Sequence, residues 1–505
     1  MHSYAWNPIN TPAPSAVIMR QVTQSPNGQS LSGPITTVPI ELITEIFKFV
    51  VLSSEAARSH AVKDLCLVGK HWNDIANATP DLWTKVTLVH PLSPNQLSAV
   101  RKRLKASEPK VIDVEIDLRE PVFYYSRFGV SYPLVDPLPI SEVVAALRGS
   151  EHRWRSISIS SDTEDPIHEF LGAQVVSNFP ALESIDLKST DERPAEYGTR
   201  LTAPWRDRFP VPFGGNGTLV PKLREVSICA VHLDWTSAFV TQFRNLRKLE
   251  IKNQSDGRGP TIQQFSALAA ASPGLEILDV SGCCEIIDDT EFQPSFIRLP
   301  ALKNLAFAWT ELKFACRFLM ELQIPETLET LSLVDTEVGL GIQKMEDEDY
   351  ELTVHEGPAR SPWIFELFAI LGLRDRRDTN PSGTWISVFG LKNLSLSWVD
   401  VPRDGLTHFL QNAPGIEEIR LRDVGTGVLE SVSYLVESRS LPSLKRVYLR
   451  WVHGGGYQSK ELHTFICNLR NAGVRTIIKG SIGEDALPTP IEMNGRLVKR
   501  NADWA

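Results

Sequence analysis

One short pattern recurs along most of this 505-residue chain and constrains its fold more than any other feature. An aliphatic residue is followed by two variable residues, a second aliphatic residue, one variable residue and a third aliphatic residue, often with a proline shortly before. The pattern reads LRKLEI at 246–251, LEILDV at 275–280 and LKNLAF at 302–307. Further copies begin at Leu182, Leu223, Leu328, Leu391, Ile416 and Leu444. A pattern repeated in this way predicts a repeated supersecondary unit.

The spacing of the copies identifies the unit. Successive steps between the leading aliphatic positions from Leu246 to Leu328 are 29, 27 and 26 residues. Leucine-rich repeats have a period of about 20 to 29 residues. Helical stretches come before most copies, at 237–243, 265–271, 314–322, 406–412 and 431–438. The sequence therefore predicts a unit of strand, loop, helix and loop.

A single unit of this kind cannot bury its own apolar face, so the units must stack. We expect an α/β fold: a leucine-rich-repeat solenoid with a curved parallel sheet over residues 90–480, including early repeats at 110–118 and 153–160 and a last one at 474–480. Long inserts near 189–219 and 336–388 interrupt the period, and such loops are either functional or simply mobile. The second insert holds an acidic run at 346–349 and a predicted short helix within 361–373. Polar composition predicts a disordered tail at 1–33, and 481–505 is expected to form a C-terminal tail.

Charge and hydropathy narrow the class of protein. The formal net charge is −9 and the isoelectric point is near 5.8, whereas nucleic-acid binders usually carry a basic face. No apolar stretch reaches the roughly 18 residues that a spanning helix needs, and the N-terminal residues lack the order of a secretory signal. We expect no nucleic-acid partner, no membrane partner and a cytoplasmic or nuclear location.

Motifs for catalysis or cofactor binding are missing from the sequence. There is no phosphate-binding glycine loop, no dinucleotide fingerprint and no metalloprotease helix motif. The six cysteines show no metal-ligand spacing, and reduced buried thiols are the expected state. We therefore predict no enzyme activity, no catalytic residues, no metal site and no cofactor.

A different pattern occupies residues 34–89, ahead of the repeats. The stretch VPIELITEIFKFV at 38–50 places apolar residues on a helical period after Pro39, which suits a first helical turn. A second helical segment is expected at 56–68 and a third after it, through Trp72. Three short helices in so few residues form a bundle near the lower size limit for independent stability, so we expect part of its apolar surface to be covered by another surface.

This N-terminal region resembles an F-box. The resemblance rests on the Pro-Ile-Glu-Leu opening, the Ile-Phe pair, a Leu-x-Leu-Val segment before a tryptophan, an Ile-Ala pair and the closing Pro-x-Leu-Trp. Many F-box proteins carry leucine-rich repeats after the F-box. The resemblance implies docking on the Skp-type adaptor of a cullin-RING ubiquitin ligase through Pro39, Ile40, Leu42, Ile43, Ile46, Phe47, Leu65, Leu67, Val68 and Trp72.

Two functions remain open from the sequence. The first is a substrate-recognition subunit of an SCF-type ligase, which holds an unknown target protein on its repeats. The alternative is an adaptor-independent leucine-rich-repeat scaffold, in which the helices merely cap the repeats. Candidate target-binding residues lie on expected strands, just past strand ends or in the first insert: Glu183, Asp186, Trp205, Arg247, Glu250, Trp309, Trp398, Arg420 and Trp451.

Overall fold

The computed structural model of this protein forms two compact units, one ending at Ala78 and one beginning at Thr79. Residues 79–89 were expected to belong with the N-terminal helices, but they lie in the second unit, where a strand at 85–89 joins the sheet. The residues described are 38–52, 58–119, 139–173, 178–190, 220–233, 235, 243–254, 259–282, 297–309, 312–324, 327–336, 367–368, 385–386, 388–399, 401, 403–450 and 459–479.

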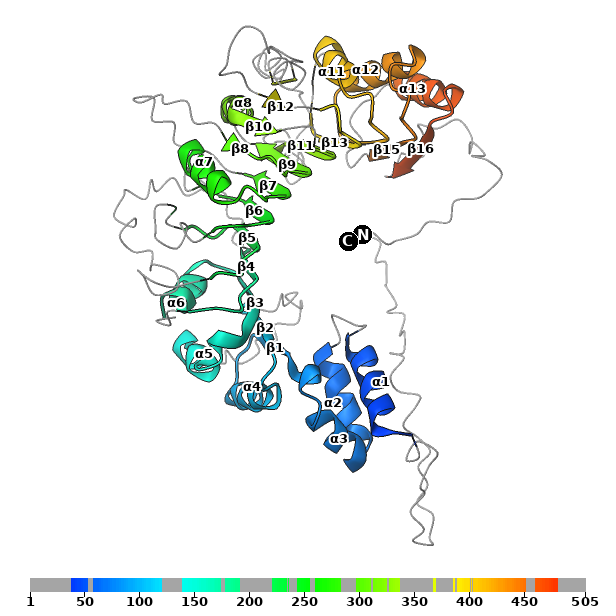
Figure 1. The fold of residues 1–505 in the computed structure, drawn as a ribbon. Coiled ribbons are helices and arrows are strands. Elements are labelled where there is room, and N and C mark those ends of the chain that lie inside the picture. Colours follow the sequence, from blue (N-terminus) through cyan, green and yellow to red (C-terminus); the bar gives the residue numbers. More distant parts are fainter. Residues whose placement is uncertain are drawn as a thin grey trace, which may run out of the picture. The chain divides into compact units, whose positions relative to one another are not determined.

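The first unit consists of three short helices, as the sequence predicts. They are α1 (Ile40–Leu52), α2 (Arg58–Val68) and α3 (Lys70–Asn77), drawn in blue in Figure 1. Pro39 stands directly before α1, and its carbonyl accepts hydrogen bonds from the N–H groups of Leu42 (3.1 Å) and Ile43 (3.2 Å). Proline has no N–H to lose at this position, so it starts the helix without cost.

The second unit is built on a large parallel sheet. Within the described residues thirteen strands pair side by side, and each lies next to the strand that precedes it in this sheet. This order agrees with the expected α/β class. The strands are β1 (Lys85–Val89), β2 (Ile112–Asp117), β3 (Trp154–Ser161), β4 (Ser184–Ser189), β5 (Glu225–Cys229), β6 (Lys248–Lys252), β7 (Ile277–Ser281), β9 (Asn304–Trp309), β11 (Thr330–Asp335), β13 (Asn393–Ser397), β14 (Glu418–Arg422), β15 (Arg446–Arg450) and β16 (Arg475–Lys479).

Helices line one side of this sheet (Figure 1). They are α4 (Pro94–Ala106), α5 (Ile140–Leu147), α6 (Asp165–Ala173), α7 (Ile262–Ala271), α8 (Leu312–Glu321), α11 (Arg403–Gln411), α12 (Thr426–Glu437) and α13 (Ser459–Asn471). A second, smaller sheet joins β8 (Ile297–Arg298), β10 (Leu322–Ile324) and β12 (Trp385–Ile386). The expected helical segments at 265–271, 314–322, 406–412 and 431–438 coincide with α7, α8, α11 and α12, whose C-terminal ends agree within one residue and whose N-terminal ends lie two to five residues earlier than expected.

The core lies between the main sheet and the helices. In β6, Leu249 and Ile251 are buried, whereas Glu250 between them is partly exposed. The strand register places Leu278 of β7 beside Leu249. This alternation follows from the pleat, which sends successive side chains to opposite faces. The face away from the helices is therefore free to carry polar side chains.

A left-handed residue follows several strands directly. Its N–H donates to a carbonyl near the end of the next strand, over 2.8–3.2 Å, so the turn continues the hydrogen-bond ladder. Glycine and asparagine adopt this conformation readily, whereas alanine and tryptophan pay a steric cost. These residues are Ala230 (φ 51°), Asn253 (φ 53°), Gly282 (φ 61°), Trp398 (φ 56°) and Asp423 (φ 47°).

Several expectations fall outside the described residues or were incomplete. Most of both inserts and of the helical segments expected at 237–243 and 361–373 lies outside the described ranges, as do both tails. β1, α4, α5, α6, α13 and the small second sheet were not predicted from the sequence.

The packing of α12 on the preceding repeat gives a test of the fold. A Cβ atom added at Gly427 would lie 2.3 Å from the carbonyl oxygen of Val401, whereas one added at Gly274 would meet no atom within 4 Å. We expect Gly427→Ala to lower the free energy of unfolding by about 1 to 3 kcal/mol, because backbone must move to admit the methyl group. The matched control Gly274→Ala should change it by less than about 0.5 kcal/mol. Urea denaturation measures both, and equal midpoints would contradict the close approach.

Candidate functional site

The core of the first unit uses only part of the apolar surface of α1. Ile43, Phe47 and Val51 follow one another at four-residue spacing and are 3%, 0% and 0% exposed. The ring of Phe47 lies 4.9 Å from that of Trp72 on α3, measured between centroids. Leu65 of α2 is also buried. These side chains hold the three helices together.

A second apolar stripe on α1 is left uncovered. Leu42, Ile46 and Phe49 are 56%, 54% and 75% exposed. With about 100° of rotation per residue, these three positions lie beside the buried stripe, and Glu41, Glu45 and Lys48 occupy the remaining side. The exposed large apolar residues of the bundle are Ile40, Leu42, Ile46, Phe49, Val50, Leu67 and Val68. We call Leu42, Ile46 and Phe49 the apolar face.

The structure divides the predicted adaptor-binding residues into two groups. Ile43, Phe47 and Leu65 are buried inside the bundle, so their side chains cannot line an accessible surface, and Trp72 is half-buried against Phe47. The exposed group consists of Pro39, Ile40, Leu42, Ile46, Leu67 and Val68. Sequence reasoning missed Phe49, although its position on the helical wheel beside Leu42 would have indicated it.

Two phenylalanines of α1 test this division directly. Phe47→Ala should destabilise the bundle by about 3 to 5 kcal/mol, because it removes a fully buried ring. Phe49→Ala, two residues away and 75% exposed, should change stability by less than about 0.5 kcal/mol. Native-state amide exchange of α1 in the full-length protein measures both changes. Equal protection in the two variants would show that Phe47 is not in the core.

The predicted target-binding residues on the sheet also fall into two groups, one within the strands and one just before them. Asp186, Glu250 and Arg420 lie on the sheet face away from the helices, as predicted. Glu183 and Arg247 come just before β4 and β6 and are exposed. Their main chains continue the sheet ladder, since the Arg247 carbonyl accepts from Glu276 N–H at 2.8 Å.

The predicted tryptophans differ most from expectation. Trp309 is 1% exposed, and its ring stacks on Phe307 with centroids 6.0 Å apart, so it belongs to the core and cannot be a surface contact. Trp398 follows β13 and remains half-buried. Trp205 and Trp451 lie outside the described residues.

Charges on the middle of the sheet neutralise one another. Lys252 Nζ lies 2.7 Å from Asp279 on the next strand and 3.7 Å from Glu250, which also pairs with Lys248 at 3.2 Å. Burial opposes ionisation of Glu250, but Lys252 and Lys248 outweigh it and lower the pKa of Glu250. This carboxylate is therefore already engaged within the sheet.

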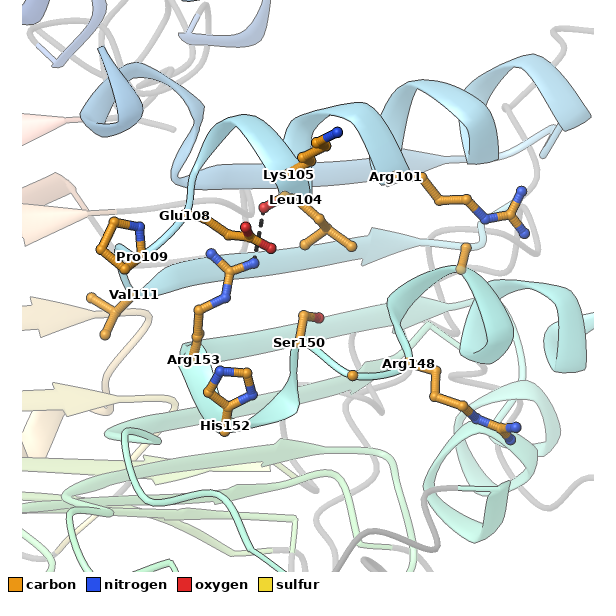
Figure 2. A pocket seen from close by; sticks show the side chains of 12 residues that line it. Arg101, Leu104, Lys105, Glu108, Pro109, Val111, Arg148, Ser150, His152 and Arg153 are labelled. Atoms are coloured by element: carbon orange, nitrogen blue, oxygen red, sulfur yellow. Dashed lines mark hydrogen bonds between the residues drawn. The ribbon is translucent and has the colours of Figure 1, made fainter. Parts of the chain in front are cut away.

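A pocket of about 800 Å³ opens on the second unit at the C-terminal ends of α4 and α5 (Figure 2). Its lining is basic, with Arg101, Lys105, Arg148 and Arg153 against Glu108. The C-terminal end of a helix carries a partial negative charge that favours nearby cations. The basic lining therefore has a structural explanation.

Arg153 is the buried arginine of this pocket, at 8% exposure. Its guanidinium donates to the carbonyl of Leu104 at 2.9 Å, to the carbonyl of Lys110 at 3.2 Å and to Ser107 Oγ at 3.2 Å. Figure 2 shows this group directed at the last turn of α4. Arg153 thus caps α4 and ties it to β3.

This role of Arg153 can be separated from ligand binding. Arg153→Met should lower the free energy of unfolding by about 1.5 to 3 kcal/mol, because charged hydrogen bonds to buried carbonyls are lost. Arg148→Met, which changes an exposed arginine of the same pocket, should alter it by less than about 0.5 kcal/mol. Chemical denaturation of both variants provides the measurement. If Arg153→Met were as stable as the parent, the capping role would be wrong.

A partly buried acid–histidine pair lies at the start of α6. Glu164 Oε2 accepts from His232 Nδ1 at 2.6 Å, and His168 Nε2 lies 2.9 Å from the His232 carbonyl. Burial opposes ionisation of Glu164, but His232 outweighs it and lowers the pKa of Glu164. Because the His232 side chain is only 8% exposed, the pair links α6 to the segment after β5.

In the part of the chain that the structure describes, no group of three or more His, Cys, Asp or Glu residues is arranged to hold a metal ion, and no helix is long and apolar enough to cross a membrane. A scan of protein-family models finds no match, and a search of curated proteins finds no significant match.

Proposed function

We propose that this protein is a substrate-recognition subunit of an SCF-type ubiquitin ligase. In this proposal the N-terminal helices are an F-box that docks on a Skp-type adaptor. The second unit is a leucine-rich-repeat solenoid that holds the target protein. The protein itself needs no active site, because holding the target near the ligase raises the effective concentration of the reacting groups.

The observation that carries the proposal is the apolar face of the bundle. Leu42, Ile46 and Phe49 are each more than half exposed on one helix, although burying such a side chain is worth about 1.5 to 3 kcal/mol. Contiguous exposed apolar surface of this kind marks interaction sites. The helix that exposes it is the one whose sequence resembles the F-box opening, which is why we assign a Skp-type adaptor as the partner.

The repeat assignment is supported by agreement between period and topology. The aliphatic pattern recurs every 26 to 29 residues between Leu246 and Leu328. Each copy contributes one strand, and successive strands are parallel neighbours. A solenoid of stacked repeats produces this arrangement, and it leaves one sheet face open for a protein partner.

The apolar face can be tested with two double variants of α1. Leu42→Ala with Ile46→Ala should weaken adaptor binding by roughly 100-fold or more. Burial of each of these side chains against the adaptor contributes about 1.5 to 3 kcal/mol, and most of that contribution is lost on truncation. Glu41→Ala with Glu45→Ala truncates two exposed residues on the other side of α1 and should change affinity by less than about threefold. Titration calorimetry with a purified Skp-type adaptor measures both.

The outcome also decides between the two functions left open by the sequence. Both double variants change exposed side chains, so amide exchange of α1 should match that of the parent protein. If the parent protein does not bind the adaptor, or if Leu42→Ala with Ile46→Ala binds as well as the parent, the ligase proposal fails. An adaptor-independent scaffold would then be the better description.

A further inference from the structure

The last three strands of the main sheet carry a cluster of arginines on the face away from the helices. Within the register, Glu418, Arg446 and Arg475 are neighbours across the strands, and so are Arg422 and Arg450. The burial pattern of these strands places Ile419, Leu421, Val447 and Leu449 on the opposite, helical side. We call Arg420, Arg422, Arg446, Arg450 and Arg475 the arginine patch.

The charge of this patch is not balanced by its own surroundings. Glu418 is buried and pairs with Arg420 at 2.7 Å and with Arg446 at 3.1 Å. Asp423 lies 3.7 Å from Arg422. Among the residues that the structure describes, these are the only carboxylates that form ion pairs with the five arginines. No described carboxylate pairs with Arg450 or Arg475.

The rest of the same sheet shows that such imbalance is not general. Lys85 pairs with Glu115 at 2.9 Å, and Arg155 pairs with Asp113 on the neighbouring strand. The chain as a whole carries a net charge of −9. The excess of positive charge on three adjacent strands is therefore opposite in sign to the charge of the whole protein. This surplus is therefore a local feature of β14–β16.

Like charges directly opposite each other across strands destabilise a sheet. Arg422 and Arg450 occupy such a position. Burial lowers the pKa of Arg422, and the charge of Arg450 lowers this pKa further. The folded sheet thus contains a repulsion that an anionic partner would relieve.

Aromatic rings hold two of the arginines in place. The guanidinium of Arg422 lies 4.5 Å from the ring centroid of Trp398, and that of Arg420 lies 5.3 Å from the ring of Tyr448. Trp398 has a φ of 56°, at a turn position that other strands fill with Ala230, Asn253, Gly282 or Asp423. Trp398 is the bulkiest of these residues, and strained backbone can be retained where it serves a function. Here it places a ring under an arginine.

We propose that the arginine patch binds an acidic, extended segment of the target protein, rich in Asp and Glu. Arginine pairs with carboxylates through two parallel hydrogen bonds. Three strands span roughly 10 Å across the sheet and the five strand positions span roughly 13 Å along it. Charges spread over that area match several carboxylates better than a single phosphate group. The identity of the occupant as a ligase target rests on the proposed function.

The test measures binding of a fluorescein-labelled peptide, Gly-Glu-Asp-Glu-Asp-Glu-Asp-Gly, to the full-length protein by fluorescence anisotropy. The parent should bind it and should not bind the same peptide with Gln and Asn in place of the acids. Arg422→Glu with Arg450→Glu should weaken binding by about tenfold or more, because the reversed charges repel the ligand. Raising the salt from about 50 to about 500 mM should also weaken it, through screening.

A charge-matched control separates this surface from the net charge of the protein. Lys188→Glu with Lys222→Glu makes the same change in net charge at two exposed lysines elsewhere on the second unit and should leave binding unchanged. Arg422→Gln with Arg450→Gln provides a second variant if charge reversal prevents folding, and it should weaken binding as well. The proposal would be overturned if the lysine control lost as much affinity for the peptide as the arginine variants, or if neither arginine variant lost affinity.

Other occupants are distinguished in the same assay. Tighter binding of a single-stranded oligodeoxythymidine than of the peptide, or displacement of the peptide by low concentrations of inorganic phosphate, would contradict an acidic protein segment as the occupant.

The chain's own acidic run is a competitor for the same patch, so the titration is repeated with residues 346–349 replaced by serines. If the peptide fails to bind this variant too, the inference is wrong. Adaptor binding through α1 is measured separately, so either result can fail alone.

Discussion

The parallel sheet depends on aliphatic side chains that no single repeat can cover. Each strand presents two or three of them toward the helices, as Leu249 and Ile251 do in β6, and a lone five-residue strand would leave them in water. Stacking places the next strand beside them and adds main-chain hydrogen bonds, such as Lys303 N–H to the Glu276 carbonyl at 2.9 Å. Every repeat is therefore stabilised mainly by its neighbours. The side chains on the opposite face of the sheet do not contribute to the core.

The two surfaces proposed for binding would use different forces. The apolar face on α1 offers hydrophobic area, whose contribution is non-directional and nearly indifferent to moderate salt. The arginine patch on β14–β16 offers charge, which acts over about 8 Å at physiological ionic strength and weakens as salt rises. A protein that binds one partner by apolar burial and another by charge can change its affinity for the second partner without losing the first. In the proposed ligase, the adaptor would be the constant partner and the target the exchangeable one.

Some features of both surfaces could be predicted from sequence because they depend on local periodicity. Alternation of side chains along a strand is a property of the pleat, so LRKLEI already indicates that Glu250 faces away from Leu249 and Ile251. The repeat period then gives the order of the strands. β1 was missed because Val86 and Leu88 lie in the segment 34–89 that was assigned to the N-terminal helices, and because this strand lacks the leading aliphatic residue of the other copies. The pairing of β1 with β2 places it in the main sheet instead.

The sequence by itself determined that a short N-terminal helical bundle is followed along the chain by stacked strand and helix units, because both follow from the spacing of apolar residues along a few turns of chain. Only the tertiary structure decided which apolar residues are core and which are surface. Ile46 and Phe47 are adjacent and equally apolar, yet one is 54% exposed and the other fully buried. Likewise Trp309 is buried, whereas Trp398 lies under Arg422. Exposure depends on which neighbouring element covers a position, and residues distant in sequence supply that cover.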